Sequence, residues 1–556
     1  MRQSLLIGGV VSLGAIMAVA CGSSNTNGAP DDAGSSGSSG TSGTSGASGT
    51  SGTSGTSGSS GDPDGGGDGG GDNNPQLKAG DVSLIGVTND SQVVYTVKGT
   101  GTTHNIEAVP LAGGAPATLG TVADDNDISL AGNTVAFWTA VDATGVGTIN
   151  LWTKAGGVKA NVATQSVPGL ISSSEDGSKI AFTLNSPADT ADIAITTPGA
   201  PSVVANATTA LLPNVNVVSP ACSADFGFVG KTFFSGHCTG PGNGAGALTK
   251  ASLVEVADLV TPTVKTLVDG AAAAGINAIR PQWSPDKTGT HLLVFALTAG
   301  AAANQARVLT RGSGAPTVTN IENNAASGFL SDDGTKVFYR TTAPAAGGGT
   351  PNAFRSAPAL ANNATPNNPP AGAITLVASP GYPSTINVSP DKTHVLFRKL
   401  AVVGAKGEVP RVDINLIDTT TAAQTGAALV ATATGFPGGF TSTGTHVIYL
   451  TELSAQGIGK LKVRPVAAAG VERDVASGAG LPRPLPGGTR AVFFNNPKQA
   501  GQGVSIDLQI FDVAGTAAPK PVVTAIDPFF EIAGAGTKVV YTRPGATGGL
   551  YAAVLP

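Results

Sequence analysis

One short pattern recurs along this chain about every 50 residues, and it limits the possible folds more than any other feature. Each copy has a turn containing Ser or Gly, then Lys, Arg, His or Thr, then two apolar residues and an aromatic residue. The ten aromatic residues, 42 to 61 positions apart, are Tyr95, Phe137, Phe182, Phe234, Phe295, Tyr339, Phe397, Tyr449, Phe493 and Tyr541. A period of this length is typical of propellers and other repeat architectures.

Each copy of the pattern predicts a β-hairpin. The Asp/Gly or Gly-Thr segment favours a tight turn, and the β-branched and aromatic residues after it favour a strand. A second apolar strand usually follows, as at residues 149–152, 192–195, 412–417 and 506–511. Three or four antiparallel strands per repeat make a sheet that cannot bury both faces alone, so we expect the sheets to stack around an axis. We find no convincing long amphipathic helix, and the expected fold class is all-β.

The turn sequences also carry a family resemblance. Ser-Pro-Asp or Ser-Asp-Asp-Gly followed by Lys, two apolar residues and an aromatic residue resembles the TolB-like, WD-type propeller repeat, most closely at residues 281–286. The resemblance covers roughly residues 80–556 and implies a β-propeller. We expect about 7–10 blades in one ring or, alternatively, two tandem propellers that divide near residues 300–330, because propellers usually have four to eight blades.

The last repeat, at residues 550–555, is one strand short, and the segment near Leu77–Val87 could supply that strand. The predicted domains are a signal peptide at residues 1–20, a tether at 21–76 and the propeller at 77–556.

The amino terminus resembles a bacterial lipoprotein signal. Arg2 precedes a short apolar stretch that ends in Ala18-Val19-Ala20-Cys21, which is similar to the lipobox. The resemblance implies a thioether lipid on Cys21, cleavage before it and acylation of the new amine; two or more acyl chains give stable anchoring. Gly22, rather than Asp, after the cysteine favours the outer membrane of a bacterial cell envelope, on its periplasmic or its outer side. The alternative is an ordinary secretory signal cut after Ala20.

The next 50 or so residues contain almost only Gly, Ser, Thr, Asp and Asn. Such a segment cannot offset its ordering entropy by apolar burial, so we expect a disordered tether with a mean span of about 40 Å. Its spaced acidic residues, Asp62, Asp64, Asp68 and Asp72, raise the possibility of a calcium loop, but the EF-hand spacing and its closing Glu are absent. We therefore expect an acidic spacer, and no metal or cofactor.

The charge pattern argues against nucleic acid as a partner. The net charge is −5, and Lys and Arg form no basic block of the kind that phosphate binding requires. No second apolar run is long enough to span a bilayer. The expected partners are the membrane, through the lipid, and an unidentified protein or glycan.

The two remaining cysteines, Cys222 and Cys238, flank an expected turn at residues 227–230. In an oxidising envelope we predict a disulfide between them, and closing a loop of this length contributes about 3 kcal/mol. Zinc is the poorer alternative, because His237 is the only further ligand nearby and zinc takes four.

Neither the histidines nor the repeat aspartates indicate catalysis. His291, His394 and His446 occupy the repeat position that elsewhere holds Lys or Arg, and we expect them to be structural. His104 has no recognisable carboxylate or nucleophile partner, and neither does His237. We expect the repeat carboxylates to cap turns, and these are Asp176, Asp286, Asp332 and Asp391.

No sequence motif of a hydrolase, metalloprotease, P-loop or dinucleotide site is present. The favoured function is a membrane-tethered binding or scaffold module without catalytic residues. The alternatives are a propeller hydrolase or lyase with a site in the central channel, and a structural surface protein.

Overall fold

The computed structural model describes most of the repeat region. The described residues are 74–186, 190–199, 212–216, 225–239, 250–257, 263–269, 282–296, 305–323, 325–342, 351–364, 368–378, 383–402, 411–419, 428–431, 436–454, 457–467, 471–500, 503–543 and 548–556. The predicted signal peptide and nearly all of the predicted tether lie outside them.

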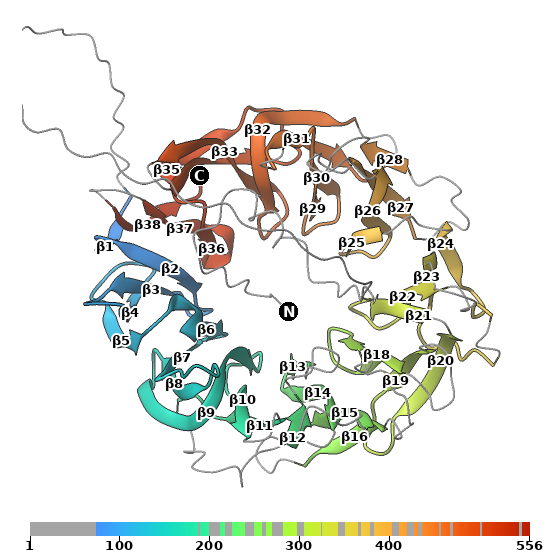
Figure 1. The fold of residues 1–556 in the computed structure, drawn as a ribbon. Coiled ribbons are helices and arrows are strands. Elements are labelled where there is room, and N and C mark those ends of the chain that lie inside the picture. The colour runs from blue at the N-terminus through green and yellow to red at the C-terminus, as the bar shows by residue number, and fades with distance from the viewer. Residues whose placement is uncertain are drawn as a thin grey trace, which may run out of the picture.

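The described strands form ten antiparallel blades arranged in one ring (Figure 1). Six sheets have four strands. The other two have seven strands each, because in each of them one long strand belongs to two blades. We call the strands of a blade A to D from the ring axis to the outer rim. The all-β propeller expected from the repeats is confirmed, and the described strands form a single ring.

The blades are numbered in chain order. Blade 1 contains β2 (Val82–Val87), β3 (Gln92–Lys98), β4 (His104–Pro110) and β5 (Ala117–Val122), and blade 2 contains β6 (Ile128–Ala131), β7 (Thr134–Thr139), β8 (Gly147–Thr153) and β9 (Gly157–Ser173). Blade 3 contains β9 again, β10 (Ile180–Ser186), β11 (Thr190–Thr196) and β12 (Leu212–Asn216), and blade 4 contains β13 (Asp225–Val229), β14 (Thr232–Thr239), β15 (Lys250–Val256) and β16 (Lys265–Asp269). Blade 5 contains β17 (Gln282–Pro285), β18 (His291–Ala296), β19 (Gln305–Thr310) and β20 (Thr317–Asn323).

Blade 6 contains β21 (Ala325–Leu330), β22 (Lys336–Thr342), β23 (Pro351–Pro358) and β24 (Ile374–Ala378), and blade 7 contains β25 (Pro383–Val388), β26 (His394–Val402), β27 (Arg411–Asp418) and β28 (Ala428–Ala431). Blade 8 contains β29 (Phe436–Phe440), β30 (His446–Thr451), β31 (Gly459–Pro465) and β32 (Arg473–Pro484), and blade 9 contains β32 again, β33 (Arg490–Ala500), β34 (Gly503–Asp512) and β35 (Lys520–Ile526). Blade 10 contains β36 (Phe530–Ala533), β37 (Lys538–Arg543), β38 (Gly549–Val554) and β1 (Gln76–Ala79). The helices of the described residues are two 3-10 turns, η1 (Asp125–Asp127) and η3 (Gly534–Gly536), and no described helix is long and apolar enough to cross a membrane.

The hydrophobic core consists of ten apolar layers, one between each pair of neighbouring blades. The layer between blades 5 and 6, for example, joins Phe295 and Val308 to Val337 and Tyr339, so the ring is continuous near residues 300–330. All ten aromatic residues of the repeat pattern lie on strand B of successive blades and are at most 2% exposed. The repeat therefore marks the strand that is covered on both faces of each blade.

The ring closes inside blade 10. Strand β1 pairs antiparallel with β38, placing Gln76 opposite Tyr551 and Ala79 opposite Gly549. The strand needed to complete the last repeat thus comes from the start of the described chain, as expected, but it is Gln76–Ala79. Residues Val82–Val87, in the second part of the expected segment, form strand A of blade 1.

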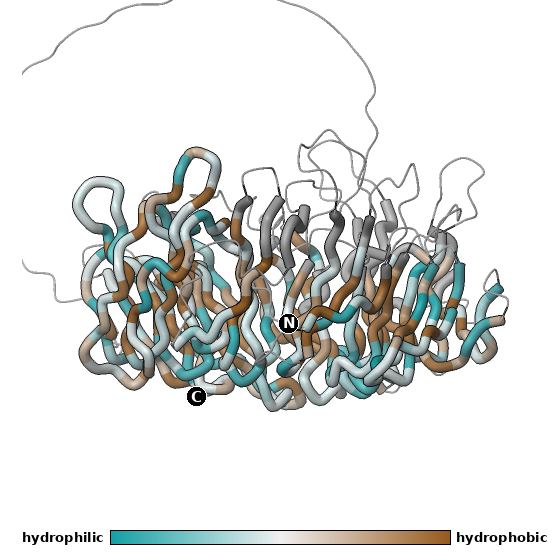
Figure 2. The backbone as a smooth tube through the Cα atoms, turned by 90° about the horizontal axis from the view of Figure 1, so that it is seen from below, coloured by the Kyte–Doolittle hydropathy of each residue, from teal (hydrophilic) through white to brown (hydrophobic). Residues whose placement is uncertain are grey.

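The strands run between two faces of the ring, which Figure 2 shows from the side. We call the face with the A–B turns and the C–D connections the turn face, and the opposite face, with the B–C and D–A connections, the loop face. In seven blades a backbone amide just after strand C bonds the carbonyl just before strand B, which ties the C–D corner to the A–B turn. The pairs are Leu111–Ser91, Arg311–Thr290, Ala359–Thr335, Thr419–Thr393, Val466–Thr445, Val513–Thr489 and Leu555–Thr537.

Candidate functional site

The A–B turns have a built-in polar core, best seen in blade 6. The Ser331 hydroxyl donates to Asp333 at 2.6 Å and accepts the Lys336 amide at 3.0 Å. The amide and hydroxyl of Thr335 donate to the same carboxylate, and Gly334 adopts a φ of +67°, which favours glycine. The Asp side chain therefore replaces backbone partners that a tight turn cannot supply.

This arrangement corrects the sequence alignment of the repeat aspartates. Asp176 and Asp391 cap their turns as expected, but in blade 6 the capping residue is Asp333 and not Asp332, whose backbone oxygen accepts the Lys287 amide of blade 5. Asp286 occupies the position of the first serine and accepts the amides of residues 290 and 291. These carboxylates have structural roles.

Neighbouring turns contact one another around the turn face. The Asn89 amide bonds the Gly132 carbonyl, and the Glu175 amide bonds the Gly230 carbonyl. Ion pairs join Lys231 to Asp176 and Lys392 to Asp333 in adjacent blades. Hydrogen bonds from the backbone and hydroxyl of Ser178 and from Ser174 hold the pKa of Asp176 well below its usual range, and the Ser331 hydroxyl does the same for the pKa of Asp333.

Three of the histidines lie where the repeat placed them. His291, His394 and His446 each begin strand B, the position that Lys336, Arg490 and Lys538 occupy in other blades. The His291 ring contacts the buried Asp286 carboxylate at 2.8 Å, and the His394 ring contacts the Thr393 hydroxyl at 2.7 Å. Both rings complete the turns beside them, in agreement with a structural role.

A further histidine has a partner that the sequence analysis missed. His104 Nδ1 lies 2.6 Å from Asp125 Oδ1, and the Thr96 hydroxyl donates to the same oxygen at 2.8 Å. The three residues lie at the loop face of blade 1. The carboxylate therefore orients the imidazole ring. The signal that could have revealed this pair is the acidic run at residues 124–127, which follows the last strand of the same repeat.

Buried glutamates join strands and blades at larger radius. Glu322 of blade 5 accepts the Tyr339 hydroxyl at 2.7 Å and pairs with Arg355, both of blade 6. Glu255 of blade 4 pairs with Lys265 of its own blade and with Arg311 of blade 5. A buried carboxylate with two charged or polar donors is stable only when both are in place.

Two further, less buried glutamates each bind a tyrosine and a lysine. Glu107 of blade 1 accepts the Tyr95 hydroxyl at 2.6 Å and Lys78 of β1 at 2.7 Å, and Glu472 of blade 8 takes the Tyr449 hydroxyl and Lys462. Burial, followed by the bond to the carboxylate, raises the pKa of Tyr95 and Tyr449. These phenols are donors that fix the blades and do not titrate in the physiological range.

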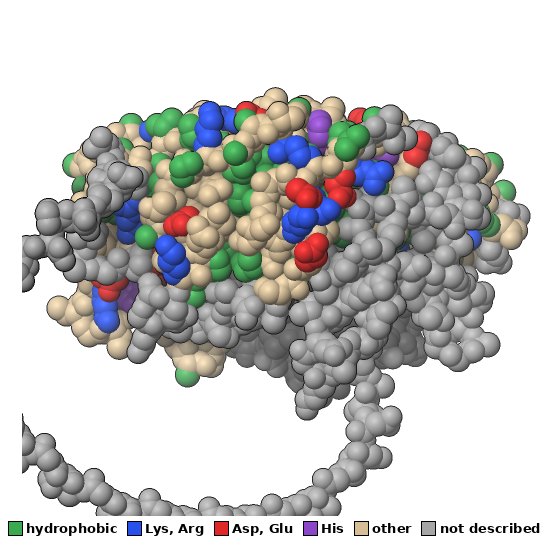
Figure 3. Space-filling model, turned by 90° about the horizontal axis from the view of Figure 1, so that it is seen from above, with side chains coloured by type: hydrophobic (Ala, Val, Ile, Leu, Met, Phe, Trp, Pro, Cys, Tyr) green, Lys and Arg blue, Asp and Glu red, His purple; other side chains and the backbone are tan. Residues whose placement is uncertain are grey.

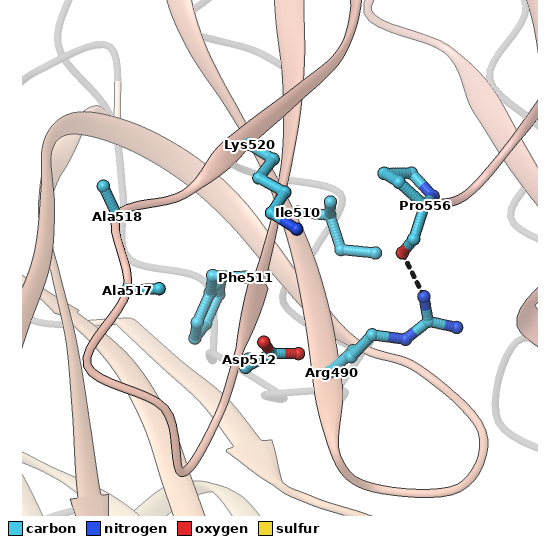
Figure 4. A pocket seen from close by; sticks show the side chains of 8 residues that line it. All are labelled: Arg490, Ile510, Phe511, Asp512, Ala517, Ala518, Lys520 and Pro556. Carbon is cyan, nitrogen blue, oxygen red and sulfur yellow. Dashed lines mark hydrogen bonds between the residues drawn. The ribbon is translucent and has the colours of Figure 1, made fainter.

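A small open pocket lies at the turn face of blade 9 (Figure 4). It is lined by Arg490, Ile510, Phe511, Asp512, Ala517, Ala518, Lys520 and Pro556. The Arg490 guanidinium already donates to the backbone oxygen of Pro556. The pocket therefore contributes to the packing of the last residue more than it offers a binding site for an organic ligand.

The predicted lipid and disulfide sites fall outside what the structure describes. Cys21 and Cys222 lie outside the described residues, and for Cys238, on β14, the backbone alone is described, as it is for the neighbouring His237. The β13–β14 hairpin turns at Gly230–Lys231. The disulfide remains a prediction. Among the described residues, no group of three or more His, Cys, Asp or Glu side chains could hold a metal ion.

Six exposed hydrophobic side chains of the described residues lie on the turn face, each in a different blade. Of the seven large hydrophobic residues that are exposed in the described part of the chain, six lie at C–D corners or strand ends of the turn face. They are Val158, Val264, Val318, Leu360, Val471 and Val554. On the rim over β31 and β32, basic and acidic side chains gather beside hydrophobic ones (Figure 3).

Comparison with known proteins does not assign a family. No family model matches the chain, and neither does any curated protein. Solved structures similar to it include a eukaryotic initiation factor (12% identity, 73% of this chain and 89% of that chain, TM-score 0.39), the β-propeller domain of the Trilobed protease from Pyrococcus furiosus (12%, 59% and 94%, 0.31) and a putative TolB from Agrobacterium tumefaciens (14%, 53% and 94%, 0.24).

Proposed function

We propose that this chain is a lipid-anchored propeller of the bacterial cell envelope, and that the ring binds a protein or glycan partner there. The observation that carries the proposal is the position of β1. This strand directly follows the predicted tether and forms the outermost strand of blade 10, so the chain joins the ring at its rim. An anchor attached there leaves the loop face open for binding.

The tether suits this function because it supplies reach. A chain of about 50 flexible residues spans about 40 Å on average, so one anchored ring can sample partners within that distance of the membrane. Confinement near the membrane raises the effective concentration of ring and partner, and weak contacts then suffice for binding.

Two experiments test the proposal. Cys21→Ser should move the protein from the membrane fraction to the soluble fraction, and unchanged membrane retention would refute the anchor. Crosslinking of the intact chain in cells, from a photoreactive residue at the loop-face position Lys98, should capture one predominant protein or glycan. A matched probe at Gly312 on the turn face serves as the control, and the binding proposal is wrong if both probes give the same diffuse products.

A further inference from the structure

We propose that the turn face is a membrane-docking surface, on which the ring lies against the bilayer that holds its anchor. This inference rests on the proposed lipid attachment at Cys21. It adds an orientation to the proposed function, because docking of the turn face presents the loop face to the surroundings.

The first argument is the placement of exposed hydrophobic side chains. Val471, Val554 and Leu360 are 84%, 68% and 54% exposed, and all three lie at the turn face of different blades. Val158, Val264 and Val318 extend the set to six blades spread around the ring. A flat bilayer can contact residues spread in this way simultaneously, whereas a compact protein partner would cover one or two of them. Each side chain that leaves water contributes roughly 25 cal/mol per Å² of apolar area.

The second argument is a basic residue repeated on the same face. In eight consecutive blades, 3 to 10, the residue that begins strand B or directly precedes it is Lys, Arg or His, and in five of these blades it is Lys or Arg. These residues are Lys179, Lys231, His291, Lys336, His394, His446, Arg490 and Lys538. Lys and Arg side chains at an apolar boundary extend their charged ends to the lipid headgroups.

The carboxylates of the turns moderate this charge. Asp176 and Asp333 lie beside Lys231 and Lys392 and are held inside the turns by hydrogen bonds. The face is therefore of mixed charge, and the apolar side chains supply most of the attraction. We accordingly expect docking on zwitterionic lipid, with a smaller gain from anionic lipid.

The third argument is where the chain joins the ring. Strand β38 ends at the turn face with Val554, and the antiparallel β1 begins beside that end, since the Ala552 amide bonds the Pro75 carbonyl. The described chain therefore starts on the turn-face side of the rim, next to one of the most exposed valines. A tether that enters there keeps this face nearest to the membrane, and the resulting effective concentration makes weak docking sufficient.

Lysine footprinting on vesicles tests the inference. The chain from residue 22 onward carries an amino-terminal hexahistidine tag and is bound to phosphatidylcholine vesicles containing a nickel-chelating lipid, which replaces the acyl anchor. A water-soluble amine-reactive reagent is then applied, and labelling is measured by mass spectrometry. Labelling of Lys336 and Lys538 should fall about threefold on the vesicles, as expected if most tethered molecules are docked, while that of the loop-face residues Lys98 and Lys498 stays unchanged.

Matched variants separate docking from general effects of the vesicle. Leu360→Asp, Val471→Asp and Val554→Asp together should restore labelling of the turn-face lysines. Phe529→Asp should not, because Phe529 is the exposed hydrophobic residue of the D–A connection at the loop face. The inference is overturned if the vesicles change the labelling of both faces equally or protect the loop face. It is also overturned if protection of the turn face persists in the triple variant.

The two proposals fail separately. The vesicle experiment supplies its own anchor, so unprotected turn-face lysines together with release by Cys21→Ser would remove the docking surface and leave the anchored propeller standing. If the turn-face lysines are protected in cells but not on lipid vesicles, the turn face binds a protein, and this result also overturns membrane docking.

Discussion

Blades 1 and 10 are neighbours in the ring, but their outer strands are held in different ways. In blade 1, β5 follows β4 through a short connection at residues 111–116 and pairs with it from Ala108 to His104. In blade 10, β1 pairs with β38 at three positions across a separation of more than 460 residues. The outer strand of blade 10 therefore has no covalent link to the strand beside it.

Side chains of β1 and the residues before it compensate for the missing link. Asn74 donates to the Tyr541 hydroxyl at 3.2 Å and Gln76 to the Tyr551 hydroxyl at 3.0 Å, on the side of the sheet toward blade 9. Lys78 reaches Glu107 of blade 1 on the other side. The register shift between Gln76 and Lys78 turns these two side chains toward opposite neighbouring layers. The comparison teaches that side-chain bonds replace chain connectivity at the closure.

The largest expected effect comes from removing the closing strand. A chain that starts at Gly80 loses β1 and its bonds, exposes the edge of β38 and should lose about 4 kcal/mol of unfolding free energy, at about 1 kcal/mol for each hydrogen bond. Urea denaturation followed by circular dichroism measures the change. The control starts at Asn74 and keeps β1, so it should match the full chain; equal midpoints for the two truncations would show that the closure contributes nothing.

Two glutamates sharpen the comparison. Glu322 joins blades 5 and 6, which are consecutive in the chain, whereas Glu107 binds Lys78 of the closing strand. Glu322→Gln leaves Arg355 without its charged partner in a site where Glu322 is 5% exposed, and we expect a loss of about 3 kcal/mol. Glu107→Gln at the more exposed closing pair should cost about 1 kcal/mol. Thermal and urea unfolding of both variants measure the difference.

The pH dependence separates an ionic role for Glu107 from a packing role. Burial alone would raise the pKa of Glu107, but the bonds from Lys78 and Tyr95 outweigh it and lower that pKa. Its contribution is therefore present above the ordinary pKa of a Glu and is lost as the pH falls through the lowered value. If Glu107→Gln costs the same at pH 7 and at pH 3, the ion pair does not hold the closing strand.

The long shared strand β32 offers the opposite case, a junction made by continuous chain. Gly480 lies where this strand passes from blade 8 to blade 9, and a Cβ there would clash with the Phe494 ring. Gly480→Ala should displace that ring and cost about 2 kcal/mol, which unfolding in urea measures. Gly312→Ala, where the space is open, is the control; equal stability of the two variants would show that the junction tolerates repacking.

The sequence predicted the parts of this fold that repeat. All ten motif aromatics fall on strand B because each blade needs a large residue in the same layer, and the turn chemistry of Ser174 and Ser389 follows from local hydrogen bonds. The position of the turn glycine also indicates the capping residue, because Asp176 directly precedes Gly177 and Asp333 directly precedes Gly334, and both cap their turns. Alignment on that glycine would have selected Asp333 instead of Asp332.

Contacts between blades could not be predicted in the same way. Glu322 meets Tyr339 and Arg355 because the register of two adjacent sheets brings them together, and no repeat position marks that register. His104 and Asp125 are brought together across one blade by the fold of a non-repeating loop segment. Such pairs depend on how neighbouring strands are aligned in space, which a local pattern does not contain.

The smallest expected effect tests whether the capping carboxylate stabilises an A–B turn. Asp333→Ala removes the acceptor for Ser331 and Thr335, and we expect a loss of about 1 kcal/mol at pH 7 for a half-exposed side chain. Asp332→Ala is the matched control and should be neutral, because its backbone oxygen makes the contact with Lys287.

The bond from Ser331 lowers the pKa of Asp333, so the carboxylate stabilises the folded state above its unfolded pKa of about 4, and that stabilisation disappears as the pH falls further. The difference between the two variants should therefore shrink between pH 5 and pH 2. A difference that stays constant over this range would mean that the turn depends on the shape of the side chain and not on its charge.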